Sequence, residues 1–448
     1  MITDTEVKEI YTAIAELIQN QQANEADKLI HTLLERDPND GVALNFYGVL
    51  HLEAHNFSEA YQYFRRALQE RPNLPVIWLN FGLASHELNR NEEAIKAYLK
   101  AAELDNNFTK AYVNAAAVFI EQSQWDDAEK SCNIALEIDP GNSMAEKNMA
   151  HVYLAKHKWK EGWAYWEKSL GSKFRKEWSY DKGEKRWDGS PGKAVVVYGE
   201  QGLGDEINYA SCVPDAIKDC KKVIIDCDPR LEKLFKRSFP KAIVHGTRRE
   251  PHPEWLKDAR IDARAAMASL PSIYRNSDES FPGTPYLTAD PELRSMFRKL
   301  FDSYGKPVIG MCFKSGSRYT LQHKRSIEPE QFSPLFQKDA VFISLEYKEI
   351  INHPLVKDFS WATKASDYDL TAALIAELDA VIGIHTTAMH CANALGTPTF
   401  ILTHEFYQWR YEGDYLWSKT AKVYHKKKDE QWRETVRRAV NDMGLKDK

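Results

Sequence analysis

The first third of the chain repeats itself every 34 residues, and this period constrains its fold more than any other feature. The registers begin at Val7, Gly41, Pro75, Thr109 and Ser143. The twentieth position of each register is small: Ala26, Ala60, Ala94, Ala128 and Gly162. The twenty-fourth is bulky in most: Ile30, Phe64, Tyr98, Cys132 and Trp166. The eighth is small from the second register on: Gly48, Gly82, Ala116 and Ala150.

This pattern resembles the tetratricopeptide repeat, in which two antiparallel helices pack through small residues at their crossing. No single repeat buries its apolar face, so neighbouring repeats must stack. The sequence therefore predicts an α-solenoid of about five repeats over residues 1–176, followed by a linker over residues 177–192.

Asparagine occupies the sixth position of three repeats, as Asn80, Asn114 and Asn148. On the first helix of a repeat this position faces the concave groove, and a carboxamide offers both a donor and an acceptor. A ladder of such groups predicts a site that holds an extended peptide backbone. The alternative is that asparagine is simply common at this position. Array and ladder together resemble the repeat superhelix of O-linked N-acetylglucosamine transferase.

From Lys193 on, short apolar runs alternate with helical stretches, which is typical of buried parallel strands in a doubly wound α/β region. We expect two Rossmann-like halves, residues 193–290 and 291–448, with a ligand cleft between them and a closing C-terminal helix. The fold class is thus α followed by α/β. The predicted strands cover residues 194–200, 222–227, 242–246, 307–313, 340–346, 380–384 and 399–402.

The stretch "GEQGLGDE" follows the first predicted strand. Its glycines do not have the G-x-G-x-x-G spacing of a dinucleotide site. The loop of Gly202 and Gly204 instead brings Asp205 to the mouth of the strand, where open α/β sheets bind ligands. Asp205 is either a general base for an acceptor hydroxyl or a helix N-cap, and the loop alone favours neither.

The second half offers an anion site. Thr386 and Thr387 lie between a strand and a helix, whose first N–H groups and dipole suit a phosphate. A basic loop with Lys314, Ser315 and Arg325 could neutralise a diphosphate or be an ordinary solvated loop. Glu346 ends a strand and could hold ribose hydroxyls or be an ordinary strand-end acid.

The α/β region resembles glycosyltransferase family 9, the heptosyltransferase-like group with the GT-B fold, here fused to repeats. The matching stretches occur in family order: "GEQGLGDEINYA", "DARAAMASLP" with "PYLTADP", "KRSI", "YDLTAALIAELDAVIGIHTTAMHCANALGTP" and "QWR". The resemblance implies inverting, metal-independent transfer of a sugar from a nucleotide-sugar. It assigns Asp205 as the catalytic base, Lys314 or the neighbouring basic residues to the diphosphate, and Glu346 to the nucleoside. It assigns the phosphate loop to Thr386, Thr387 and His390.

One position departs from this family. His385 stands where an aspartate is usual before the threonines, which leaves the donor open. His385 and His390, five residues apart and without a carboxylate cluster, do not suggest a metal site. His390 could equally be a core residue of its helix. The rival hypothesis is a catalytically inactive repeat scaffold that binds peptides or proteins.

Composition narrows the class of protein. The chain is 43% apolar and 28% charged, and its formal net charge of −5 does not suggest nucleic-acid binding. No apolar run approaches the roughly 20 residues of a membrane span. The acidic N-terminus does not suggest a signal peptide, and six scattered cysteines suggest free thiols. We expect a cytoplasmic enzyme with no cofactor, whose partners are a nucleotide-sugar and a protein, peptide or glycan acceptor.

Overall fold

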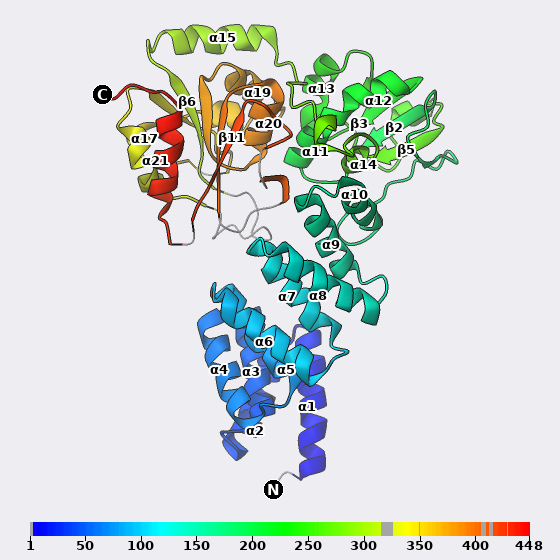
Figure 1. Ribbon diagram of the computed structural model, residues 1–448, viewed down its shortest axis with the longest axis vertical. Helices are drawn as coiled ribbons and strands as arrows, with labels where there is room; N and C mark the ends of the chain where they lie inside the picture. Colours follow the sequence, from blue (N-terminus) through cyan, green and yellow to red (C-terminus); the bar gives the residue numbers. More distant parts are fainter. Residues whose placement is uncertain are drawn as a thin grey trace. The chain divides into compact units, whose positions relative to one another are not determined.

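The computed structural model describes residues 3–248, 250–257, 259–314, 326–348, 350–404, 409–411, 415–427 and 429–448. The chain divides into two compact units, Met1–Val152 and Tyr153–Lys448. The division falls inside one helix, and each unit is described by itself. Figure 1 colours the first unit blue to cyan.

The first unit consists of paired antiparallel helices. Four of the predicted repeat starts coincide with the first residue of an odd-numbered helix, from α3 to α9. The helices are α1 (Asp4–Gln19), α2 (Ala23–Arg36), α3 (Gly41–Glu53), α4 (Phe57–Glu70), α5 (Pro75–Glu87), α6 (Asn91–Leu104), α7 (Thr109–Glu121), α8 (Trp125–Ile138) and α9 (Ser143–Ala155), of which α9 continues into the second unit.

In the pairs α3–α4 and α5–α6 the helices cross at a glycine that packs on an aromatic ring. A Cβ atom added at Gly48 would lie 2.5 Å from Cε1 of Phe64, and one added at Gly82 would lie 2.5 Å from Cε1 of Tyr98. Both rings are almost fully buried. Because a methyl group does not fit, the ring itself fills the space at the crossing. The eighth and twenty-fourth positions of the predicted period thus meet in space.

The turn between the paired helices is also repeated. The residue at each turn has a left-handed backbone, with φ between 55° and 61°: Gln21, His55, Asn89, Ser123 and His157. The N–H group of the following residue returns to a carbonyl five positions earlier, as in Asn56 to His51 at 2.8 Å. This closes each first helix with a Schellman-type cap. None of the five residues is glycine, so each turn costs about 1 kcal/mol of backbone strain.

The second unit contains two parallel sheets. The first has the order β1-β5-β2-β3-β4 and the second β11-β10-β9-β6-β7-β8. In the first sheet the strands are β1 (Lys185–Arg186), β2 (Ala194–Tyr198), β3 (Lys222–Asp226), β4 (Ile243–His245) and β5 (Ala263–Ala266). In the second they are β6 (Val308–Cys312), β7 (Val341–Ser344), β8 (Val356–Asp358), β9 (Ala380–Ile384), β10 (Thr399–Thr403) and β11 (Ala421–His425).

All seven predicted strands occur in these sheets, within two residues of the predicted bounds. The sequence did not predict β1, β5, β8 or β11, because these strands are short or carry charged residues. In the second sheet the chain begins in the middle, at β6, and adds strands on both sides; in the first sheet the two-residue β1 forms an edge, and β2 is the central strand from which β3, β4 and β5 continue to both sides. Such a reversal of strand order leaves a crevice outside the carboxyl ends of the central strands.

Helices flank both sheets (Figure 1). The predicted closing helix is α21. Among the residues that the structure describes, no helix is long and apolar enough to cross a membrane. The helices are α10 (Trp159–Lys168), α11 (Leu203–Tyr209), α12 (Val213–Asp219), α13 (Glu232–Ser238), α14 (Leu270–Tyr274), α15 (Pro291–Asp302), α17 (Ser333–Phe336), α18 (Ser360–Thr363), α19 (Asp369–Ala376), α20 (Thr387–Leu395) and α21 (Trp432–Asp442).

A buried ion pair fixes the turn between β2 and α11. The Glu206 side chain is 1% exposed, pairs with Arg248 and accepts the backbone N–H of Asp228 at 3.0 Å. A Cβ atom added at Gly199 would lie 1.9 Å from Oε1 of Glu206, so only glycine leaves room for this carboxylate. Burial raises the pKa of the Glu206 carboxyl to about 7, and the Arg248 guanidinium opposes that rise.

The Gly82 crossing gives a first prediction. Replacing Gly82 by alanine displaces the Tyr98 ring, and we expect the free energy of unfolding to fall by about 1–3 kcal/mol. The next repeat offers a matched control, because it has Ala116 and Cys132 at these two positions. In a Tyr98→Cys background, Gly82→Ala should lower the free energy of unfolding much less than it does in the wild type. Urea denaturation of the four full-length proteins measures the coupling, and a value near zero would contradict the packing role of Gly82.

The raised pKa of Glu206 predicts a pH dependence. The folded protein binds this proton up to about pH 7, whereas the unfolded chain releases it near the ordinary value of 4.5. The contribution of Glu206 to the free energy of unfolding is therefore fully present below pH 4.5 and is lost as the pH rises to about 7. The loss amounts to up to roughly 3 kcal/mol. Glu206→Gln should lack this loss. The measurement is the unfolding free energy of both proteins from pH 4 to pH 8. Parallel curves of free energy against pH would contradict the prediction.

Candidate active site in the second unit

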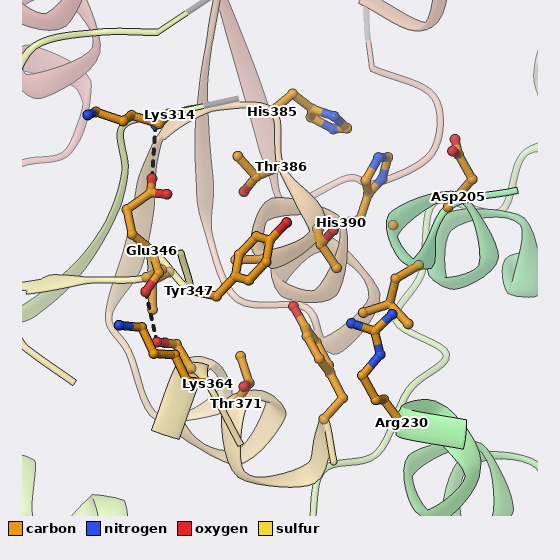
Figure 2. A pocket seen from close by; sticks show the side chains of 18 of the residues that line it. Asp205, Arg230, Lys314, Glu346, Tyr347, Lys364, Thr371, His385, Thr386 and His390 are labelled. Carbon is orange, nitrogen blue, oxygen red and sulfur yellow. Dashed lines mark hydrogen bonds between the residues drawn. The ribbon is translucent and has the colours of Figure 1, made fainter. Parts of the chain in front are cut away.

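A cavity of about 720 Å³ lies between the carboxyl ends of β6, β7 and β9 and the turn that leads from β2 to α11. These strand ends adjoin the crevice that the strand order of the second sheet creates. Figure 2 shows Lys314 and Glu346 on one side of the cavity and Asp205 and Arg230 on the other. The walls therefore come from segments that are far apart in the sequence.

Three neighbouring strands of the second sheet deliver the predicted donor-side residues. Lys314 follows β6, Glu346 follows β7, and His385 and Thr386 follow β9. Since β9, β6 and β7 are adjacent and parallel, these side chains share one edge of the sheet. The Glu346 carboxylate accepts the backbone N–H groups of Phe313 at 2.7 Å and Lys314 at 2.9 Å, which ties the ends of β6 and β7 together.

The N-terminus of α20 forms another part of the wall. Its N-cap is Thr386, whose side chain makes no capping hydrogen bond, and Thr387 and Ala388 line the cavity. The first N–H groups of a helix have no partner within the helix and carry partial positive charge. Gly383 brings β9 close to β6 just before this point, because an added Cβ would lie 2.0 Å from the Cys312 carbonyl oxygen. Its φ of 142° also requires glycine.

His385 and His390 contact each other at the cavity wall. Their ring centroids are 4.0 Å apart with the planes at 83°, and the residues are only 9% and 6% exposed. The Tyr415 hydroxyl lies 3.5 Å from Nε2 of His385. His390 is thus both a buried helix residue and a residue of the cavity. In the described part of the chain, no group of three or more histidine, cysteine or acidic side chains is arranged to hold a metal ion.

Asp205 lies in the first turn of α11 and lines the cavity opposite Lys314. Gly202 is the N-cap of this helix, so Asp205 does not cap it. The carboxylate is 31% exposed and pairs with Nη2 of Arg410 at 3.3 Å. This ion pair holds the carboxylate at the wall while leaving it accessible.

Gly204 lets the N-terminal turns of α11 and α20 approach each other. A Cβ atom added there would lie 3.1 Å from Cδ2 of His390 and 3.2 Å from Oγ1 of Thr387. Both distances are tighter than ordinary van der Waals contact. The glycine-rich loop therefore serves helix packing at this point and brings the Asp205 turn next to the Thr387 turn.

Part of the cavity wall was not predicted from the sequence, namely Arg230, Tyr347, Lys364, Tyr368 and Arg410. Arg410 belongs to the "QWR" motif, so the resemblance contained a signal for it. Arg230 carried none: it lies in the short helix η2 (Pro229–Leu231) after β3. Asp228 holds its guanidinium in two-point contact, at 2.9 Å to Nε and 3.0 Å to Nη2.

Other predicted residues lie elsewhere. Ser315 and Arg325 are outside the described residues. In the first unit, Asn80 donates to the Asn45 carboxamide at 2.9 Å, and Asn148 donates to the Val113 carbonyl at 3.2 Å. Asn148 is only 6% exposed, whereas Asn114 is partly exposed. Two of the three carboxamides thus bond to residues of the preceding repeat, and peptide binding by this ladder stays a prediction.

Comparison with known proteins supports the repeat array. Two tetratricopeptide-repeat family models match residues 11–75 and 51–119. Protein FlbA of Caulobacter vibrioides is 30% identical over 294 residues, which cover 56% of this chain and 48% of FlbA. The chain thus spans about half the length of this curated relative.

Solved repeat proteins are similar to about a third of the chain. The type IV pilus biogenesis factor PilW is 22% identical with a TM-score of 0.35, over 37% of this chain and 77% of PilW. TTC0263, a thermophilic TPR protein of Thermus thermophilus, is 17% identical with a TM-score of 0.32, over 36% of this chain and 89% of its own. YrrB, described as a TPR protein with an unusual peptide-binding site, is 20% identical with a TM-score of 0.32, over 36% of this chain and 82% of its own. The prediction of a tetratricopeptide array is confirmed: residues 11–119 match the family models.

Proposed function

We propose that the protein is a glycosyltransferase that moves a sugar from a nucleotide-sugar to an acceptor hydroxyl, with inversion and without a catalytic metal. One observation carries the proposal: Asp205 and Lys314 line opposite sides of a single cavity, whose wall also includes the N-terminus of α20. A proton acceptor and an anion site on opposite walls are what such a transfer requires. Two parallel sheets with a cavity at their carboxyl ends also support the GT-B fold.

The charge of the cavity suits a diphosphate. Its wall contains the cationic side chains of Arg230, Lys314, Lys364 and Arg410 against the carboxylates of Asp205 and Glu346. Asp205 is paired with Arg410, and Glu346 accepts two backbone N–H groups. Asp228 pairs with Arg230, so four cationic side chains stand against three carboxylates. This excess of positive charge attracts an anionic ligand to this edge of the sheet.

In the proposed reaction the acceptor hydroxyl attacks the anomeric carbon of the donor while Asp205 takes its proton. A new carbon–oxygen bond forms, and the bond from the anomeric carbon to the diphosphate breaks. Negative charge develops on the departing diphosphate, where Lys314 and the first N–H groups of α20 stabilise it. Attack from the Asp205 side, opposite the leaving group, inverts the anomeric centre.

The repeat array would present the acceptor, a protein, peptide or glycan. This part of the proposal rests on the chain's own carboxamides. The partly exposed Asn114 and the Asn45–Asn80 pair offer donors and acceptors that suit the backbone groups of an extended peptide.

A catalytically inactive scaffold is the second candidate. His385 favours it, because an imidazole replaces the expected carboxylate and lies against His390 in the wall itself. The retained Asp205 and the cationic wall favour the enzyme. The two candidates differ in one simple property, since only the enzyme needs to bind nucleotides.

A panel of nucleotide-sugars, scored for released nucleotide with and without candidate acceptors, tests the proposal. Asp205→Asn should lower kcat by about 10²- to 10⁴-fold and leave nucleotide binding intact. Lys314→Met should weaken binding of the product nucleotide diphosphate about tenfold, because one charge-assisted contact is lost. Asp302→Asn, at an exposed carboxylate that ends α15, is the matched control and should change neither.

Two outcomes would contradict the proposal, one for the transferase activity and one for the role of Asp205. The first is that UDP, GDP, ADP and CMP all fail to raise the melting temperature of the full chain. The second is full turnover by Asp205→Asn. The first result leaves the scaffold as the function of the chain, and the second removes Asp205 as the base.

A further inference from the structure

One face of α10 is made of tryptophan. Trp159, Trp163 and Trp166 are spaced so that they share one side of the helix. The indole N–H of Trp159 donates to Asp278 at 2.6 Å. Those of Trp163 and Trp166 donate to the carbonyls of Arg275 at 2.6 Å and Ala268 at 2.8 Å. In the repeat register α10 is the second helix of the fifth repeat, yet its contacts place it in the second unit.

This tryptophan face packs against Trp409, the first residue of the short helix η8 (Trp409–Tyr411). The Trp409 ring meets Trp163 edge to face, with centroids 5.5 Å apart and planes at 86°. It meets Trp159 at 6.2 Å and 72°. Trp409 is only 4% exposed, so α10 holds it in a fixed orientation.

The residue after Trp409 is Arg410, which contacts Asp205. Its guanidinium carbon lies 5.3 Å from the centroid of the Trp409 ring and 5.0 Å from that of Tyr209. Its Nη2 donates to the Tyr209 hydroxyl and lies 3.3 Å from Oδ1 of Asp205. The guanidinium is thus fixed between two rings and a hydroxyl, and from there it reaches the carboxylate.

We propose that Arg410 is a positioning residue for Asp205, and that the tryptophan face of α10 fixes Arg410 through Trp409. The last helix of the repeat array is then a structural part of the catalytic centre. An ionised carboxylate with one defined partner keeps one orientation, which a proton acceptor needs at the moment of attack. The kinetic consequence rests on the proposed transferase function, but the chain of contacts from α10 to Asp205 does not.

The first experiment tests the contacts without any activity. The full chain is labelled with 5-fluorotryptophan, and its ¹⁹F resonances are assigned with single Trp→Phe variants. Asp205→Asn should move the resonance of Trp409, because its neighbour Arg410 loses its ionic partner. The resonance of Trp361, which is 52% exposed on α18, is the internal control and should stay in place. An unmoved Trp409 resonance would overturn the proposal.

The second experiment uses a donor that the wild type turns over. Tyr209→Phe keeps the ring but removes the hydroxyl that holds Nη2 of Arg410, and should lower kcat about tenfold with little change in KM. Arg410→Met should lower kcat further, and Arg410→Lys should recover part of the loss. Trp409→Leu should resemble Tyr209→Phe, whereas Trp361→Phe should match the wild type.

The two experiments separate the possible failures. If the wild type turns over no donor, the transferase function fails, and the ¹⁹F result alone decides whether α10 is linked to Asp205. If the wild type is active but Arg410→Met keeps its kcat, the positioning role is wrong while the function stands. An equal loss in Arg410→Lys and Arg410→Met, with a raised KM in both, would mean that Arg410 binds substrate instead.

Discussion

The candidate site depends on the contact between the first turns of α11 and α20. These turns follow the carboxyl ends of β2 and β9, in two different sheets. Gly204 lets them approach until an added methyl group would lie 3.1 Å from the His390 ring. If the turns stood farther apart, Asp205 would no longer lie beside the N-terminus of α20. This one close approach therefore decides whether two separate sheets share a cavity.

Buried acidic side chains and their partners hold the walls in place on both sides of that contact. On one side, Glu206 and Asp228 share Arg248, and Asp228 also holds Arg230 at the cavity. On the other, Glu346 accepts the backbone N–H groups at the end of β6. Buried carboxylates are tolerated only with such partners, so each fixes the segment to which it bonds. These buried acids of the second unit thus hold loops in place.

Helix α10 belongs to the second unit but continues the repeat pattern of the sequence. The small-residue period continues to Gly162 of α10, where an added Cβ would lie 2.7 Å from the Leu154 side chain. The neighbouring tryptophans of α10 contact the segment that contains Asp278 and the Trp409 ring. The same helix thus makes the small-residue contact that the repeat pattern predicts and packs its tryptophans against the second unit. The sequence period therefore extends the predicted array to residue 176. The contacts of α10 place this helix in the second unit, which begins at Tyr153.

The sequence by itself determined the helical array, because a fixed period of small and bulky residues leaves one way to stack helices. It also determined the buried central strands, such as β2 and β9, whose apolar runs admit no solvent-exposed face. It named Asp205, Lys314 and Thr386 as site residues, since each follows a strand. Only the tertiary structure brought Arg230 and Arg410 to the cavity and assigned Gly204 to helix packing. Those roles depend on distances between segments remote in the chain, and local periodicity contains no information about such distances.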